Sequence, residues 1–150
     1  MLIAMNRKRQ RGAQAVEFAL ILPFFLALML LIIDMGFLVF NKAVITNASR
    51  EAARAGTVLT AAPWSAAAVA AVACNYARTS LISSNGGSHA ADCSGSADPV
   101  IAVTPQVQPN FGDPVSVSVT YPYQGFLKSL MGTTVESLWS LNATTTMIHE

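Results

Sequence analysis

Apolar residues fill the early part of the chain almost without a break. Residues 18–40 are interrupted only by Pro23, Asp34 and Gly36. As a helix this segment would be about 34 Å long, which is enough to cross a bilayer. A cleaved secretory signal would have a shorter apolar region that ends in a small-residue cleavage site. We therefore predict a retained membrane-spanning helix.

The helical pattern continues beyond the apolar segment. Residues 41–55 are rich in alanine and contain no helix breaker. Small or branched apolar residues recur there at spacings of four, four and three, which places them on one helix face: Val44, Ala48, Ala52 and Ala55. Gly56, followed by β-branched Thr57 and Val58, is the expected end. The sequence predicts one helix from about Ala13 to Ala55, roughly 65 Å long.

A second helix is expected after a short break. Pro63 stands where such a helix would begin, and Thr60 is a candidate cap. Residues 64–81 are alanine-rich, and five residues form their expected buried face: Val69, Val72, Ala73, Tyr76 and Ala77. Residues 83–98 are rich in glycine, serine and aspartate, which indicates a loop.

The C-terminal third alternates in the manner of β-strands. Apolar and polar residues alternate strictly over residues 115–123, and again from Trp139 to Met147. Pro122 indicates that the first of these strands lies at an edge or ends there. Residues 100–103 form a weaker strand signal, and a short amphipathic helix is expected over 125–131.

These elements predict an α+β protein of three parts. Residues 1–12 are a basic leader, residues 13–56 a transmembrane and stalk helix, and residues 57–150 a small outer domain. That domain should pack an antiparallel-type sheet on the second helix. Its core is limited by its size, so a covalent link would help to stabilise it.

Charge is distributed unevenly along the chain. The net charge is only +1, but Arg7, Lys8, Arg9 and Arg11 precede every acidic residue. Short basic segments beside a membrane helix remain in the cytoplasm, so the outer domain should be periplasmic. Only 11% of residues are charged, and no basic face indicates binding to nucleic acid.

Glu17 is the most unusual residue of the apolar region. It places a carboxylate at the edge of a membrane helix, where charge is costly. Gly12 lies five residues earlier, and this spacing resembles the processing site of type IV pilin precursors. In those precursors a membrane aspartyl protease cuts after the glycine and leaves glutamate as the fifth residue of the mature chain.

Three stretches resemble the TadE family: residues 11–23, residues 34–36 together with 46–54, and residues 145–150. The second contains an acidic-x-Gly step at Asp34 and an A-x-R-E-x-A-R-like segment. The TadF and TadG families share parts of this opening, so the subtype stays open. TadE-like proteins are similar to minor pilins, or pseudopilins, of tight-adherence (Flp) pilus systems in the bacterial inner membrane.

The resemblance implies partners and roles for particular residues. A prepilin peptidase would remove the leader after Gly12 and leave Ala13 as the new N-terminus. Glu17 would then pair with the free amine of a neighbouring pilin-like subunit, which offsets the cost of a carboxylate in lipid. The other implied partners are the tight-adherence secretion machinery and the inner membrane. Whether the protein enters the fibre, caps it or remains in the membrane stays open.

Cys74 and Cys93 both fall in the predicted outer domain. In an oxidising compartment such a pair indicates a disulfide, which would attach the loop to the second helix. The alternative is that they are two unrelated small core residues.

No motif of an enzyme, metal site or cofactor site is convincing. His89, Asp92 and Cys93 supply at most three ligands, and we expect a solvated loop beside a disulfide there. His149 is also expected to be solvated. No catalytic residue, metal or cofactor is predicted. The alternative function is that of a signal-anchored periplasmic sensor or adaptor domain, unrelated to pili, that would be indifferent to changes at Gly12 and Glu17.

Overall fold

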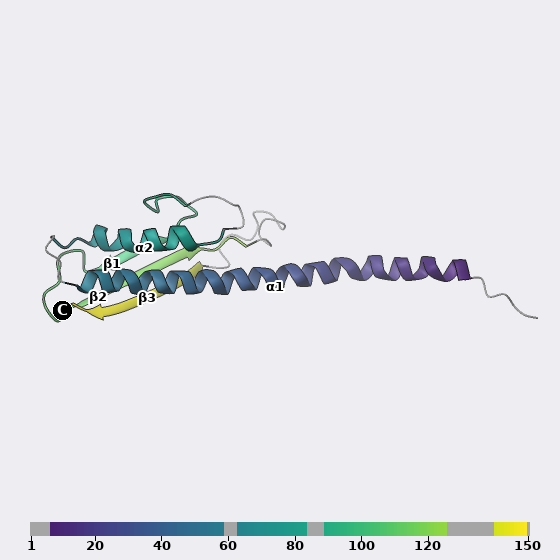
Figure 1. The fold of residues 1–150 in the computed structure, drawn as a ribbon, viewed down its shortest axis with the longest axis horizontal. Coiled ribbons are helices and arrows are strands. Elements are labelled where there is room, and N and C mark those ends of the chain that lie inside the picture. The colour runs from purple at the N-terminus through teal and green to yellow at the C-terminus, as the bar shows by residue number, and fades with distance from the viewer. Residues whose placement is uncertain (1–6, 59–62, 84–88, 126–139, 150) are drawn as a thin grey trace, which may run out of the picture.

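A long helix projects from a small α+β domain in the computed structural model, which describes residues 7–58, 63–83, 89–125 and 140–149 (Figure 1). The elements are α1 (Arg7–Thr57), α2 (Ala66–Ser80), β1 (Val100–Thr104), β2 (Pro114–Pro122) and β3 (Ser140–Ile148). The predicted fold class is confirmed. The short helix expected over 125–131 lies almost wholly outside the described residues, as do Thr60 and Trp139.

α1 is one continuous helix of 51 residues, roughly 75 Å long at 1.5 Å per residue. It begins at Arg7, earlier than the predicted start at Ala13, because arginine, lysine and glutamine are good helix formers. It also includes Gly56 and ends at Thr57, one residue beyond the predicted stop. Helix boundaries commonly shift by this much, since terminal turns fray.

The two halves of α1 have different surroundings. Residues 14–33 are all exposed, whereas from Asn41 onward one face is buried. This buried face packs against α2, β2 and β3, and its fully enclosed members are mostly small: Ile45, Ala48, Ser49, Ala52 and Ala53. Alanine lets neighbouring elements approach the helix backbone closely. The outer half of α1 is therefore a wall of the domain core.

α2 begins later than the sequence indicated. Its N-cap is Ser65, whose side-chain oxygen accepts a hydrogen bond from the Ala68 amide, a common way to satisfy a free N–H at a helix start. The expected burial of Val69, Ala73 and Ala77 is confirmed. The expected burial of Tyr76 is wrong, because the buried face turns toward Ala66 and Cys74, and Tyr76 is 39% exposed.

The sheet is antiparallel, in the order β1–β2–β3. The alternation predicted for β2 is confirmed, since Val115, Val117, Val119 and Tyr121 are buried. β2 is the central strand and ends at Pro122, where the lost N–H does not interrupt the ladder. The opposite face is rich in serine and threonine, and Ser116 hydrogen-bonds to Thr146 across it at 2.7 Å.

Gly56 is the point at which the outer end of α1 meets the rest of the core. A Cβ at this position would lie 3.1 Å from Val115 Cγ1 and 3.3 Å from Val69 Cγ2, so glycine permits the close approach. Its carbonyl oxygen accepts a hydrogen bond from Trp64 Nε1 at 3.0 Å and lies 3.3 Å from His149 Nδ1. His149 is buried. The prediction of a solvated His149 is therefore wrong, because its ring covers the carbonyl at the end of α1.

Candidate functional site

The residues of the predicted processing site lie on the projecting part of α1. Gly12 and Glu17 are both exposed, and Ala13 lies in the same helix. A Cβ added at Gly12 would meet nothing within 4 Å. The site is thus away from the packed domain, on a part of α1 to which another protein has access.

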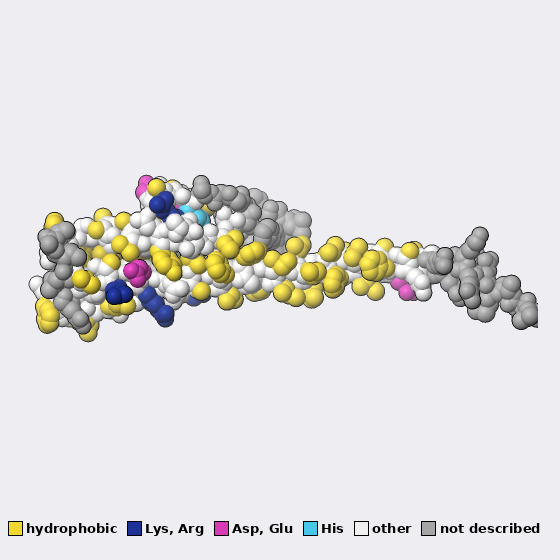
Figure 2. Space-filling model, viewed as in Figure 1, with side chains coloured by type: hydrophobic (Ala, Val, Ile, Leu, Met, Phe, Trp, Pro, Cys, Tyr) yellow, Lys and Arg dark blue, Asp and Glu magenta, His cyan; other side chains and the backbone are white. Residues whose placement is uncertain are grey.

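Large apolar side chains project from this part of α1, as the face drawn in Figure 2 shows. Phe18 and Leu20 are each 66% exposed, and Phe24 is 74% exposed. Leaving so much apolar surface in water would cost roughly 25 cal/mol for each Å². Among the described residues, α1 is the one helix long and apolar enough to cross a membrane, which is consistent with a single-pass membrane protein.

Asp34 is the one charged residue between Glu17 and Lys42. The Tyr123 hydroxyl donates a hydrogen bond to Asp34 Oδ1 at 2.6 Å and lies 3.2 Å from the Asp34 carbonyl oxygen. Gly125 packs directly on the carboxylate, with no room for a Cβ. Burial and the Asp34 hydrogen bond both raise the pKa of Tyr123, so the hydroxyl remains a donor. The sequence analysis did not indicate this contact within the chain.

Asn41 forms a second polar link between α1 and the region after α2. Its side-chain nitrogen donates to the Ile82 carbonyl at 2.8 Å, and its side-chain oxygen accepts from the Ile82 amide at 2.9 Å. Asn41 is fully buried, and this two-bond pairing satisfies its amide. Asn41 and Tyr123 together hold the near end of the domain against α1.

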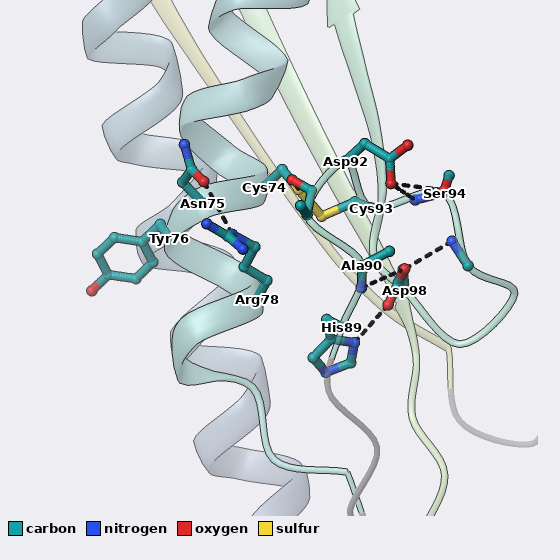
Figure 3. Close-up of a disulfide and its surroundings, with 12 residues drawn as sticks. Cys74, Asn75, Tyr76, Arg78, His89, Ala90, Asp92, Cys93, Ser94 and Asp98 are labelled. Atoms are coloured by element: carbon teal, nitrogen blue, oxygen red, sulfur yellow. Dashed lines mark hydrogen bonds and ion pairs between the residues drawn. A yellow bond between two sulfur atoms is a disulfide. The ribbon is translucent and has the colours of Figure 1, made fainter.

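Cys74 and Cys93 form a disulfide, as predicted (Figure 3). Cys74 lies on α2 and Cys93 in the following loop, 19 residues later, with their Cα atoms 5.9 Å apart. The bond ties the loop between α2 and β1 to the helix. This loop, residues 81–99, is the longest segment between two consecutive elements of the structure.

The loop also contains a buried contact between His89 and Asp98. His89 Nδ1 lies 2.8 Å from Asp98 Oδ1, and both side chains are 5% exposed. Asp98 Oδ2 accepts hydrogen bonds from the amides of Ala90 and Gly95. The expectation of a solvated loop at His89 is therefore wrong, because the Asp98 carboxylate gathers these donors and folds the loop around itself (Figure 3).

Electrostatics at Asp98 favour the ionised carboxylate. Burial opposes ionisation, but the hydrogen bonds from His89, Gly95 and Ala90 outweigh it and hold the pKa of Asp98 below its usual value. His89 Nε2 is buried and has no hydrogen-bond partner among the described residues. The ring edge also lies against Tyr121, with ring centroids 5.8 Å apart. Asp98 thus acts as the centre of the loop.

The H-x-x-D-C sequence does not form a set of metal ligands. The sulfur of Cys93 is bonded to Cys74, and Asp92 accepts hydrogen bonds from Ser94. His89 faces Asp98 instead. Nowhere in the described ranges do three or more His, Cys, Asp or Glu side chains gather in a way that would hold a metal ion.

We expect reduction of the disulfide to lower the free energy of unfolding by roughly 3 kcal/mol, since it releases the closure of a loop of this length. Urea unfolding of the full chain in detergent, with and without reductant, measures the difference. The Cys74→Ala/Cys93→Ala double variant is the control and should not respond to reductant. Identical unfolding curves for the wild type with and without reductant would contradict a stabilising role.

We expect Asp98 to make the domain sensitive to acid. Its pKa is lower in the folded than in the unfolded chain, so its contribution is fully present above the unfolded value, about 3.9, and is lost as the pH falls from that value through the lower folded pKa. Asp98→Asn should be about 2–3 kcal/mol less stable at neutral pH, because bonds to a buried carboxylate are lost. Its stability should then change less between pH 5 and pH 2.

Asp92→Asn is the matched control for this experiment, because Asp92 lies in the same loop but is exposed. Unfolding midpoints measured across the pH series should separate the two variants clearly. If Asp98→Asn and Asp92→Asn have equal effects at every pH, the buried Asp98 carboxylate does not stabilise the loop.

The comparisons with known proteins bear on α1. A sequence model described as TadE-like protein matches residues 12–54. No curated protein and no solved structure matches the chain. The match begins at Gly12 and ends three residues before the end of α1, so it covers both the apolar segment and the helical wall of the core. The predicted resemblance is confirmed over residues 12–54, which are similar to the TadE-like family.

Proposed function

We propose that this protein is a minor pilin or pseudopilin that takes part in assembly of a tight-adherence (Flp) pilus. The TadE-like match suggests a Tad pilus-associated protein with a structural role, not an enzyme. The carrying observation is that the family match starts at Gly12 and runs through Glu17 on a helix segment that the domain leaves uncovered. Its partners are a prepilin peptidase, other pilin-like subunits and the secretion machinery.

Removal of the leader after Gly12 fits the local structure. α1 runs without a break through Gly12, so a peptidase must unwind a turn before it cuts. Glycine within a helix costs about 1 kcal/mol relative to alanine, which makes local unwinding easier there. Its neighbour Ala13 is also small, and Gly12 is remote from the domain, so unwinding disturbs no packing.

The disulfide supports a periplasmic location for the domain. Disulfides persist in oxidising compartments such as the periplasm and are rare in the cytoplasm. The basic residues before Gly12 favour a cytoplasmic N-terminus on the other side of the membrane. α1 would then cross the inner membrane once, with the leader and the domain on opposite sides.

Cleavage would also change the surroundings of Glu17. A helix that begins at Ala13 has free N–H groups and a positive dipole end in its first turn. The carboxylate of Glu17 lies one turn from that end, beside an amine that exists only after cleavage. In lipid both charges are costly alone, so pairing with the amine of a neighbouring subunit would stabilise assembly.

We expect Gly12→Val to block processing. In cells that contain a cognate prepilin peptidase, the wild type should yield a chain beginning at Ala13, whereas the variant should accumulate at full length. N-terminal sequencing or intact mass of the membrane-extracted protein reports the result. A valine at residue 12 has open space around it, so the change should not disturb the fold.

Gly36→Val is the matched control, since Gly36 is a second glycine of α1 where a Cβ meets nothing within 4 Å. This variant should be cut as the wild type is. A mature wild-type chain that still begins at Met1 would exclude processing and favour the alternative of a signal-anchored sensor or adaptor.

We expect Glu17→Ala and Glu17→Gln to be inserted and cleaved normally but to crosslink at least tenfold less to other pilin-like subunits. The alanine variant removes a charge from lipid, so insertion should be equal or better. The glutamine variant keeps the shape and loses the charge, so equal losses in both variants indicate ion pairing.

Glu51→Gln is the control for these variants, because Glu51 is an exposed carboxylate on the same helix, in the half of α1 that packs against the domain. It should crosslink as the wild type does. Normal crosslinking and normal piliation in both Glu17 variants would show that the carboxylate is merely tolerated at its position.

A further inference from the structure

We propose that the domain rests directly on the bilayer. Lipid would cover an apolar surface at the end of the domain from which the apolar segment of α1 projects. This surface, the membrane-proximal face, consists of Met35, Val39 and Phe40 on α1 together with Ile82, which follows α2. The inference depends on the membrane anchoring in the proposed function and on no other part of it.

The membrane-proximal face exposes large apolar side chains, as residues 18–33 of α1 do. Val39 is 66% exposed and Phe40 46% exposed, on the side of α1 that faces away from the domain. Ile82 is 38% exposed, and the Asn41 amide holds its backbone beside α1. Apolar side chains of α1 and of the residue that follows α2 are thus adjacent at the level where the domain begins.

The length of the uncovered apolar helix supports the same placement. Within the described part of the chain, α1 is exposed from residue 14 through residue 33, and the domain contacts it at Asp34 through Tyr123. Only residues 18–33 lie between Glu17 and that contact, and as a helix they span about 24 Å. The hydrocarbon core of a bilayer is about 30 Å thick. Residues 18–33 are therefore shorter than the hydrocarbon core is thick. Residues 34–40 supply the missing length, on the side of α1 that the domain leaves exposed.

Asp34 is a charged residue at the level of this apolar surface, but its carboxylate does not face the lipid. Its carboxylate accepts a hydrogen bond from Tyr123 and is covered by Gly125, on the side of α1 that faces the domain. A charge turned toward the protein and hydrogen-bonded there is the form in which acidic residues are found at membrane depth. The opposite side of the helix is left to Met35 and Val39.

The charges bordering the face identify lipid as its occupant. The first charged side chains beyond it are basic on both helices: Lys42 on α1 and Arg78 on α2. Basic side chains next to an apolar band are attracted to anionic lipid headgroups. Tyr76, half a turn from Arg78, is of the type enriched at membrane interfaces. An aromatic and basic border of this kind fits a bilayer better than the apolar helix of another subunit.

Cysteine labelling in pure lipid vesicles tests the proposal. The full chain, with its disulfide intact, is reconstituted at low protein density in phosphatidylcholine and phosphatidylglycerol vesicles. The variants Val39→Cys and Ile82→Cys probe the face. Asn47→Cys on α1 and Ala71→Cys on α2 are matched controls, because both positions are exposed farther from the face. A membrane-impermeant maleimide is the probe, with rates normalised to protein unfolded in dodecyl sulfate.

We expect Val39→Cys and Ile82→Cys to be labelled at least tenfold more slowly than the two controls. Labelling at the control rate would overturn the proposal. So would protection that is absent in pure lipid and arises only in native membranes containing other pilin-like subunits, because the face would then bind protein.

A further variant separates this inference from the proposed function. Leu26→Cys lies in the middle of the apolar helix and should be fully protected. If Leu26→Cys is also labelled freely, α1 does not span the bilayer and both proposals fail. If it is protected while the face is labelled, the anchoring stands and only the resting of the domain on lipid is wrong. The vesicles contain no peptidase and no other subunit, so the result is independent of cleavage and pilus assembly.

Discussion

One uninterrupted helix has to satisfy two surroundings, and the remainder of the structure depends on this constraint. The first half of α1 presents large apolar side chains in all directions, whereas the second half presents a narrow face of small residues to α2 and the sheet. Alanine at positions such as Ala48 and Ala52 allows the close packing, since it adds little bulk and loses no side-chain entropy. The second half of α1 is therefore part of the domain core.

Buried polar contacts define how the domain sits on that helix. Hydrophobic packing of alanines is nearly featureless and tolerates sliding, whereas hydrogen bonds from Asn41 to the backbone of Ile82, from Tyr123 to Asp34 and between Ser49 and Thr145 each fit one register. An unsatisfied polar group in these places would cost about 1–3 kcal/mol. The contacts lie at separate levels along α1, so together they fix both the position and the rotation of the domain.

Much of the fold follows from periodicity, and what does not depends on long-range contacts. The length of α1 and the alternation of β2 can be predicted because each depends on local spacing. The burial of His89 and His149 could not, because it depends on Asp98 and on the end of α1, which are close only after folding. At the predicted processing site, the spacing of Gly12 and Glu17 is a local pattern, and both residues lie within the TadE-like match. No local pattern marked Tyr123 as a partner of α1. The contact could be expected only from Asp34, because a charge in apolar surroundings requires a partner.

The absence of a linker between anchor and domain has a mechanical consequence. α1 passes from the apolar segment into the core as a single rod of 51 residues, so the domain cannot swivel on its anchor. Each residue of a helix advances about 1.5 Å and turns about 100°. A vertical displacement of the rod by one residue, in a groove that follows its side chains, would therefore turn the domain by more than a quarter of a circle. In such a protein the depth of the apolar helix segment and the rotation of the domain about the helix axis change together. A force that displaces one end of α1 along its axis therefore acts on the other end as a torque.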